Sequence, residues 1–396
     1  MTLVTREGDR TAERGNTIRG SSLKAYADLY RLPGPWCTAY VDAGTGTVDS
    51  LEAGDVRAGN TRAQLEAQGA TSADIDAMEQ ALTPATGMPS PVSRFVLVHG
   101  GKAELNEVLP GRLVLPERMV VEPVPDLLPL LKHQPEEFPY VVAEVSREHG
   151  EIRLYRAGAG APASVREVEG ESEHIHKFHG GGWSELRFQH HTEDVWRRNA
   201  DEVAGEIDRV ASAGGARLIV LAGDIRARGL VRENLSEAGR ALLSEVDSHT
   251  HTAGADSANL EDQVSQRVAE VWAEEQQAVM DRLAVQEGQA NPEAAHGAGA
   301  VVHALQQGQV EVLILDDAAL SRRTMLALDA EPWIATAKEE ALAAGILGEV
   351  PAPAALLRAA ALTDARVLLV PGPVLPEGVD VAALLRWSPG PGVPSS

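Results

Sequence analysis

Two stretches rich in residues that break helices and strands divide the sequence and limit the size of any one hydrophobic core. The first is HQPEEFP at residues 133–139, and the second is GQANPEAAHGAGA at residues 288–300. Connectors of this composition commonly mark the ends of domains. A chain of 396 residues also exceeds what a single core usually holds. The sequence therefore predicts three folded units.

Composition and segment pattern favour a mixed α/β fold. Hydrophobic residues make up 44% of the chain, enough for packed cores. Segments with helical spacing alternate with short apolar runs that are typical of strands. We expect a flexible leader at 1–21, an N-terminal α/β domain at 22–135, a central domain at 138–288, a C-terminal α/β sandwich at 295–388 and a disordered tail at 389–396.

Individual elements follow from the same patterns. The expected helices cover residues 23–32, 61–82, 192–215, 256–286, 300–308, 352–363 and 381–387. The expected strands cover residues 37–43, 216–224, 310–317 and 365–372, with hairpins at 93–111 and 140–158. One side of the helix at 256–286 is apolar, so we expect this helix to close the central domain. Its apolar positions are Leu260, Val264, Val268, Val271 and Leu283.

Charge and cysteine content exclude several classes of protein. A formal charge of −23 argues against a protein that coats duplex nucleic acid, because such proteins place Lys and Arg against phosphates. Local binding to RNA-rich machinery stays open. The single cysteine, Cys37, excludes an internal disulfide and is expected in a core. With no secretory signal and no apolar run long enough to span a bilayer, the protein is expected in the cytoplasm without membrane contact.

The stretch EHIHKFHGGGWSELRFQHH at residues 173–191 concentrates five of the twelve histidines beside three glycines. His174, His176 and His179 have a plausible spacing for zinc ligands. A closed zinc site needs four fixed ligands, however, and a glycine-rich loop gives these side chains no rigid support. We therefore predict that the stretch holds no metal and that the protein uses no cofactor.

Catalytic and structural interpretations of the same stretch remain open. Ser184 beside Glu185 could belong to a hydrolase triad, but the sequence GWSEL lacks the second glycine of a nucleophile elbow. Alternatively, a glycine loop can hold a water beside an activated ester with its backbone amides and a polar side chain, without a covalent step. In the structural interpretation, the glycines form a hairpin tip and Trp183 packs on its own domain.

A family resemblance favours one of these interpretations. Residues 179–203 resemble the loop and following helix in the central domain of bacterial relatives of the archaeal and eukaryotic class-one peptide chain release factors, a group related to Pelota and to the hibernation factor Balon. The usual bacterial loop is close to Gly-Gly-Trp-Ser-Gln-x-Arg-Phe/Tyr-Gln-Arg. This chain matches it at Gly181, Gly182, Trp183, Ser184, Arg187, Phe188 and Gln189. Residues 35–43 are similar to the family's first strand, and residues 297–317 and 381–387 resemble its C-terminal domain.

The resemblance implies a three-domain, tRNA-shaped factor with an RNase H-like central domain and a C-terminal α/β sandwich of ribosomal-protein type. Hydrolytic members carry glutamine where this chain has Glu185, and an ionised carboxylate opposes a developing oxyanion. Gly181, Gly182 and Glu185 are therefore catalytic only if the loop is hydrolytic. The residues expected to bind ribosomal RNA are His179, Gly180, Gly181, Gly182, Trp183, Ser184, Arg187, Gln189, Arg197 and Arg198.

The resulting prediction is a monomeric, ribosome-associated translation factor that occupies the A site and acts without hydrolysis in ribosome hibernation or stress protection. Ribosomal RNA is the expected partner, and elongation factor Tu and peptidyl-tRNA are further candidates that the resemblance implies. Two alternatives remain open. One is a peptidyl-tRNA hydrolase that rescues stalled ribosomes, and the other is an acidic stress-response scaffold that has left the ribosome.

Overall fold

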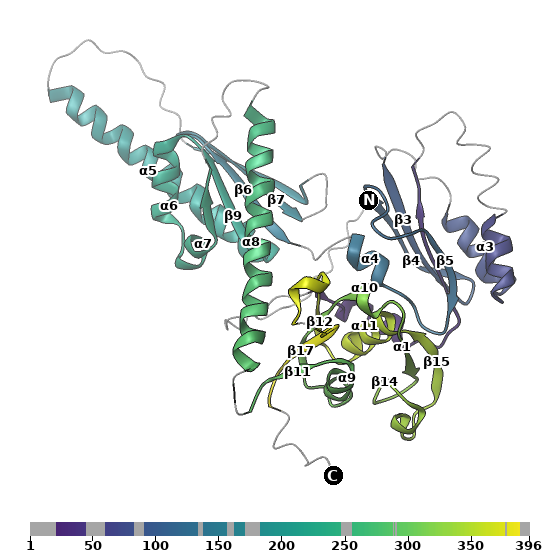
Figure 1. Ribbon diagram of the computed structural model, residues 1–396. Coiled ribbons are helices and arrows are strands. Elements are labelled where there is room, and N and C mark those ends of the chain that lie inside the picture. Colours follow the sequence, from purple (N-terminus) through teal and green to yellow (C-terminus); the bar gives the residue numbers. More distant parts are fainter. Residues whose placement is uncertain are drawn as a thin grey trace.

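The computed structural model describes residues 21–44, 60–82, 91–133, 138–156, 162–170, 183–246, 256–287, 289, 291–376 and 378–388. Over these residues the chain forms a mixed α/β fold with four sheets (Figure 1). Within them, no helix combines the length and the apolar content needed to cross a membrane.

The N-terminal sheet has the antiparallel strand order β4-β3-β2-β5. Its strands are β2 (Trp36–Asp42), β3 (Val92–His99), β4 (Lys102–Pro110) and β5 (Arg118–Glu122). Side chains alternate across β2, so Cys37 packs toward helix α3 (Ser72–Ala81) while Trp36 and Tyr40 join the core on the opposite face. Cys37 is 1% exposed, which confirms the prediction of a core cysteine.

The hairpin between β3 and β4 and the first helix agree with the sequence patterns. Gly100 and Gly101 have φ values of 57° and 76°, the conformation that a two-residue hairpin turn requires. Residues 24–31 form the short 3-10 helix η1 (Lys24–Tyr26) and helix α1 (Ala27–Arg31). The prediction of one continuous helix over residues 61–82 is wrong, because the chain breaks at Gly69, where φ is 86°.

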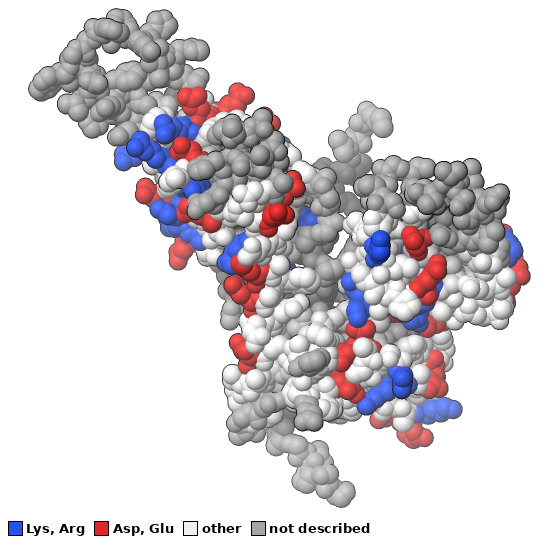
Figure 2. Space-filling model, turned by 45° about the horizontal axis from the view of Figure 1, so that its top comes forward, with Lys and Arg blue, Asp and Glu red and all other residues white. Residues whose placement is uncertain are grey.

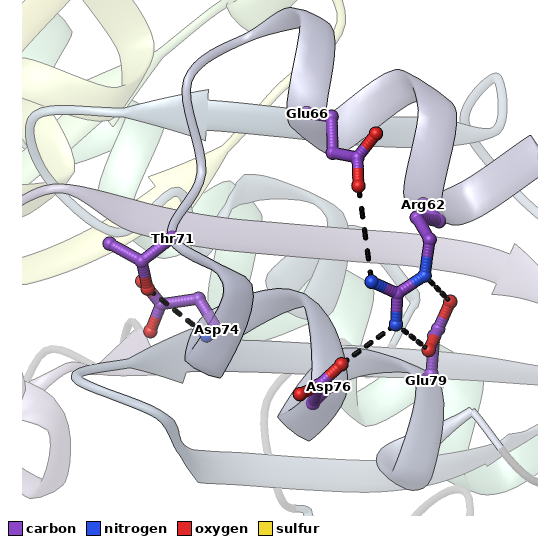
Figure 3. A network of polar contacts seen from close by, with 6 residues as sticks. All are labelled: Arg62, Glu66, Thr71, Asp74, Asp76 and Glu79. Atoms are coloured by element: carbon purple, nitrogen blue, oxygen red, sulfur yellow. Dashed lines mark hydrogen bonds and ion pairs between the residues drawn. The ribbon is translucent and has the colours of Figure 1, made fainter.

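Polar contacts join the two helices on either side of this break (Figure 3). Arg62, in the helical residues 60–67, donates to Glu79 from Nε at 3.0 Å and to Asp76 at 2.7 Å, both on α3.

Thr71 caps α3 by accepting from the Asp74 backbone N–H at 3.2 Å. The buried Asp74 carboxylate accepts from the Thr71 hydroxyl at 2.6 Å and from the Gly101 N–H at 2.7 Å. Asp74 thus ties the start of α3 to the β3–β4 turn.

The central sheet has the order β10-β9-β6-β7-β8 and contains both parallel and antiparallel pairs. Its strands are β6 (Pro139–Val145), β7 (His149–Arg156), β8 (Ser164–Glu169), β9 (Leu218–Gly223) and β10 (Leu243–Glu245). The predicted hairpin and the predicted buried strand are confirmed as β6–β7 and β9. Helices α5 (Trp183–Gly214), α6 (Ile225–Asn234) and α7 (Glu237–Ala241) lie on one side of the sheet, and α8 (Asp256–Glu287) lies on the other.

The C-terminal sheet has the order β1-β16-β12-β17-β11. Its strands are β1 (Ser21–Ser22), β11 (Ala294–His296), β12 (Val310–Leu315), β16 (Arg366–Leu369) and β17 (Val381–Leu385). Helices α9 (Ala298–Gln306) and α11 (Ala352–Leu362), as predicted, pack on one face, with the short helix α10 (Asp317–Leu320) beyond β12. A three-stranded sheet of β13 (Thr324–Leu328), β14 (Ile334–Ala335) and β15 (Ile346–Pro351) lies beside them, with the 3-10 helix η2 (Lys338–Ala341). The 3-10 helix η3 (Gly372–Val374) follows β16.

The structure differs from the sequence expectations for this region in three places. Residues 381–387 were expected to form a helix, but β17 is a strand between β12 and β11. Its five residues are all buried, and short apolar runs of this kind do not distinguish a buried strand from a helix. The connector at 288–300 contains β11 and the start of α9. Ser21, expected at the end of a flexible leader, pairs with Val367 in the C-terminal sheet.

Helix α8 contacts two sheets (Figure 1). Near its N-terminal end, Leu260 and Val264 pack against the central sheet. Near its C-terminal end, Val279 and Leu283 pack against the C-terminal sheet, on the face opposite α9 and α11. The expectation that Leu283 closes the central domain is therefore wrong, because 32 helical residues extend about 48 Å and reach beyond one sheet.

The N-terminal and C-terminal sheets share one hydrophobic core. Arg358 of α11 is buried and donates to the carbonyl oxygens of Tyr30 at 3.3 Å and Trp333 at 3.0 Å. Burial lowers the pKa of Arg358 to about 10. Lys132 of α4 (Leu128–His133) forms an ion pair with Asp317 of α10 at 2.8 Å. These contacts join segments far apart in the sequence.

Replacing Asp74 by alanine is expected to destabilise the protein by about 1–3 kcal/mol, because the Gly101 N–H and the Thr71 hydroxyl lose their buried acceptor. Urea unfolding measures the change. Asp76→Ala is the matched control, since its exposed ion pair with Arg62 is expected to contribute about 1 kcal/mol or less. Equal destabilisation by the two variants would contradict this account of Asp74.

Candidate functional site

Helix α5 carries all of the described residues that the sequence assigns to a site. Figure 1 shows its N-terminal end projecting beyond the central sheet. Trp183, Ser184, Arg187 and Gln189 were expected on a loop, but they lie in the first turns of this helix, as does Glu185. The other predicted loop residues, His179, Gly180, Gly181 and Gly182, lie outside the described residues, as do His174 and His176.

The structure separates two groups of residues that the sequence had assigned to one surface. Trp183 and Arg187 are four positions apart, so their backbone positions share one side of α5. Arg197 and Arg198 lie further along the helix, and both are exposed. At 1.5 Å per residue, Arg197 is about 15 Å along the axis from Arg187. The two arginines therefore lie near the base of the projecting segment.

The base of this segment is anchored by apolar packing. Among the residues of α5 whose side chains are described, buried apolar positions recur at helical spacing. They are Val195, Ala200, Val203, Ala204, Ile207, Val210 and Ala211. The packed part of α5 fixes the direction of its N-terminal turns. The projection of these turns beyond the sheet therefore follows from how the rest of the helix packs.

A polar cluster lies where α5 reaches the carboxyl ends of β6 and β9. We call Arg147, Trp196, Asn199 and Asp224 the root cluster. The Arg147 guanidinium lies over the Trp196 ring, 4.6 Å from its centroid, and 3.6 Å from the Asp224 carboxylate. Asn199 donates to the Arg147 carbonyl oxygen at 3.1 Å. These contacts join α5 to the loops that follow β6 and β9.

Asp224 owes its position to the glycine before it. Gly223 has a φ of 111°, and a Cβ there would lie 2.0 Å from the Val145 carbonyl oxygen. Only glycine allows this approach, which lets the Asp224 N–H donate to the same oxygen at 2.9 Å. The Asp224 carboxylate then caps α6 by accepting from the backbone N–H groups of Arg226 at 2.9 Å and Ala227 at 3.0 Å.

The electrostatics of the root cluster favour an ionised Asp224. Burial raises the pKa of this carboxyl, but the hydrogen bond from Ala227 and the charge of Arg147 outweigh burial, so the pKa is lowered overall. Sequence reasoning missed this cluster. Its one signal was the Gly-Asp pair that ends the strand at 216–224.

The described part of the site is suited to contact rather than to acid–base chemistry. Arg147, Arg197 and Arg226 present exposed guanidinium groups near the base of α5, and such groups can meet phosphates. Figure 2 shows Lys and Arg side chains mixed with Asp and Glu over the described surface of this region. Among the described residues, no group of three or more His, Cys, Asp or Glu side chains could hold a metal ion.

A known protein family matches the part of the chain that contains this site. Residues 139–289, which span the central sheet, α5 and α8, match Bacterial archaeo-eukaryotic release factor family 2. The similarity to this release factor-like family therefore covers the central domain of the chain. The resemblance read from residues 179–203 is thereby confirmed.

Similarity to one sequence relative extends beyond this region. The chain is 25% identical to the protein Rv2629 of Mycobacterium tuberculosis over 292 residues, which is 73% of this chain and 76% of Rv2629. Among solved structures, the archaeal translation termination factor aRF1 is 15% identical with a TM-score of 0.25, covering 92% of this chain and 96% of that one. Dom34 of S. cerevisiae is 12% identical with a TM-score of 0.41, covering 76% and 80%. These superpositions are loose, and no residue role follows from them.

Acid titration tests the electrostatics of the root cluster. Because the pKa of Asp224 is lowered in the folded protein, its contribution to stability is present above its ordinary pKa of 3.8 and is lost as the pH falls through the lower, folded value. Asp224→Asn is therefore expected to lose less stability than the wild type between about pH 5 and pH 2. Urea unfolding across this range measures the difference, with the exposed Asp201→Asn as the control. Parallel losses in wild type and Asp224→Asn would contradict the assignment.

Proposed function

We propose that this protein is a ribosome-associated translation factor that binds ribosomal RNA through the N-terminal end of α5. The observation that carries the proposal is the match of residues 139–289 to a release factor-like family. Within that match lies the motif from Gly181 to Gln189, and its residues from Trp183 onward begin a projecting helix. A stacking residue and a cation on one side of a helix end suit contact with RNA.

The finer proposal is that the protein occupies the ribosomal A site as a tRNA-shaped factor. The strand order β10-β9-β6-β7-β8, with three antiparallel strands followed by two parallel ones, supports an RNase H-like central domain. The layering of α9 and α11, the sheet and α8 supports a C-terminal α/β sandwich of ribosomal-protein type. In this arrangement, the end of α5 would point toward the peptidyl-transferase region.

Glu185 favours a role without hydrolysis, in ribosome hibernation or stress protection. Ester hydrolysis requires negative charge to develop on an oxygen, and an ionised carboxylate beside that oxygen would oppose it. Glu185 stands where hydrolytic relatives carry glutamine. We further propose that the protein acts in the cytoplasm as a monomer. The ribosome is its partner, and elongation factor Tu and peptidyl-tRNA are further candidates.

Ribosome binding is tested by the double substitution Trp183→Ala with Arg187→Ala. Stacking of one base is worth roughly 1–3 kcal/mol, so the loss of the aromatic ring and the cation is expected to weaken co-sedimentation with ribosomes by about tenfold or more. Arg209→Ala, which removes an exposed arginine from the anchored part of α5, is the control. If the double variant folds and co-sediments like the wild type, the end of α5 does not contact the ribosome.

Release of peptide from peptidyl-tRNA on ribosomes tests the role of Glu185. The wild type is expected to release little or no peptide, and Glu185→Gln is expected to release more if the glycine residues are otherwise competent. Each tenfold gain in rate corresponds to about 1.4 kcal/mol of barrier. Robust release by the wild type, abolished in Glu185→Ala, would instead identify a rescue hydrolase.

A further inference from the structure

The small sheet beside the C-terminal sheet presents an exposed leucine. Between β14 and β15 the chain passes through η2 and reverses in a tight turn, closed by a 3.0 Å hydrogen bond from the Ala344 N–H to the Ala341 carbonyl oxygen. Leu342 occupies the first inner position of this turn, with φ of 53° and ψ of −117°. Its side chain points into solvent, since the residue is 84% exposed.

This position is unfavourable for leucine on two grounds. Positive φ crowds the Cβ of an L-residue against the backbone, and glycine is the usual residue at this place in such a turn. Exposure also means that the apolar side chain gains nothing from burial in the isolated chain. Backbone strain of this kind concentrates at sites that bind ligands or partners. The chain thus holds a strained leucine where a glycine would fit better.

Polar contacts on both sides hold the turn in this conformation. The Gly345 N–H donates to the Asp329 carboxylate at 2.7 Å, and the Asp329 N–H donates to the Gly345 carbonyl oxygen at 2.9 Å. The Thr336 N–H donates to the Glu340 carboxylate at 2.7 Å. Ala341 is buried against Leu328 and Ala335 beneath the turn. Leu342 is therefore presented in a fixed position, which lowers the entropic cost of docking.

Acidic residues flank the exposed apolar residues along the chain. Ile346, at the start of β15, is 43% exposed. Residues 329–349 carry five exposed carboxylates and one exposed lysine, Lys338. We call the carboxylates the acidic rim; they belong to Asp329, Glu331, Glu339, Glu340 and Glu349. The hydrogen bond from the Thr336 backbone lowers the pKa of Glu340 and so keeps it ionised. An apolar contact within an acidic rim favours a partner of the opposite charge.

We propose that Leu342 and Ile346 form the apolar centre of a docking surface for a positively charged protein segment that carries a large apolar side chain. The acidic rim repels RNA phosphates and anionic lipid headgroups. It also disfavours a second copy of this chain, whose formal charge is −23. The surface lies on η2 and β15 rather than on α5, so the proposal goes beyond the RNA contact proposed above and does not depend on it.

A library of random 12-residue peptides displayed on phage, selected on the immobilised full-length protein, tests the proposal. Peptides that combine Lys or Arg with Leu, Phe or Met are expected to be enriched. One enriched peptide should bind Leu342→Ser about tenfold more weakly than the wild type, because one apolar side chain no longer contributes. Val285→Ser, which removes another strongly exposed apolar side chain outside the acidic rim, should bind like the wild type.

A second variant separates docking from a structural role of the leucine. Leu342→Gly relieves the positive-φ strain, so it should raise the urea midpoint while it loses peptide binding. Binding of the same peptide to the wild type should weaken as salt is raised, because the exposed carboxylates are screened. The proposal would be overturned by enrichment of peptides without basic residues, by equal binding to the wild type and Leu342→Ser, or by a lower urea midpoint in Leu342→Gly.

Discussion

The apolar packing of one helix against two sheets is the contact on which the placement of the site depends. Leu260 and Val264 attach the first part of α8 to the central sheet, and Val279 and Leu283 attach its last part to the C-terminal sheet. Ion pairs reinforce both attachments, Glu275 with Arg217 of the central domain and Arg282 with Glu311 of β12. Because a helix is stiff over this length, the orientation of the central sheet follows from α8.

The direction of α5 follows in turn from the central sheet. The anchored part of α5 packs on the face opposite α8, and the root cluster ties it to the ends of β6 and β9. The N-terminal turns of α5 therefore point away from the shared core of the N-terminal and C-terminal sheets (Figure 1). A projecting helix on a packed base can enter a narrow RNA-lined space without unfolding.

The sequence predicted elements whose signal is local and missed those that depend on distant partners. Gly100 and Gly101 identify a hairpin because glycine permits positive φ. Residues 381–385 were misassigned because a five-residue apolar run has no period, and only the strands on either side make it a strand. Leu283 was assigned to the wrong sheet because helical spacing identifies an apolar face and does not identify what covers it.

The candidate site was likewise predicted only in part. A motif of adjacent residues located the start of α5, yet it could not indicate that Trp183 to Gln189 are helical or that Arg197 lies well along the helix from them. The root cluster brings together residues from three separate segments, and Leu342 depends on a backbone conformation that leucine rarely adopts. Apart from the Gly-Asp pair at residues 223–224, neither arrangement has a sequence pattern, because both arise from tertiary contacts.

A cryo-EM map of ribosomes incubated with the purified protein tests the central claim most directly. The account predicts density for the protein in the A site, with the first turns of α5 against ribosomal RNA and α8 between the central and C-terminal sheets. Ribosomes without the protein, or a bound protein whose α5 points into solvent, would contradict it.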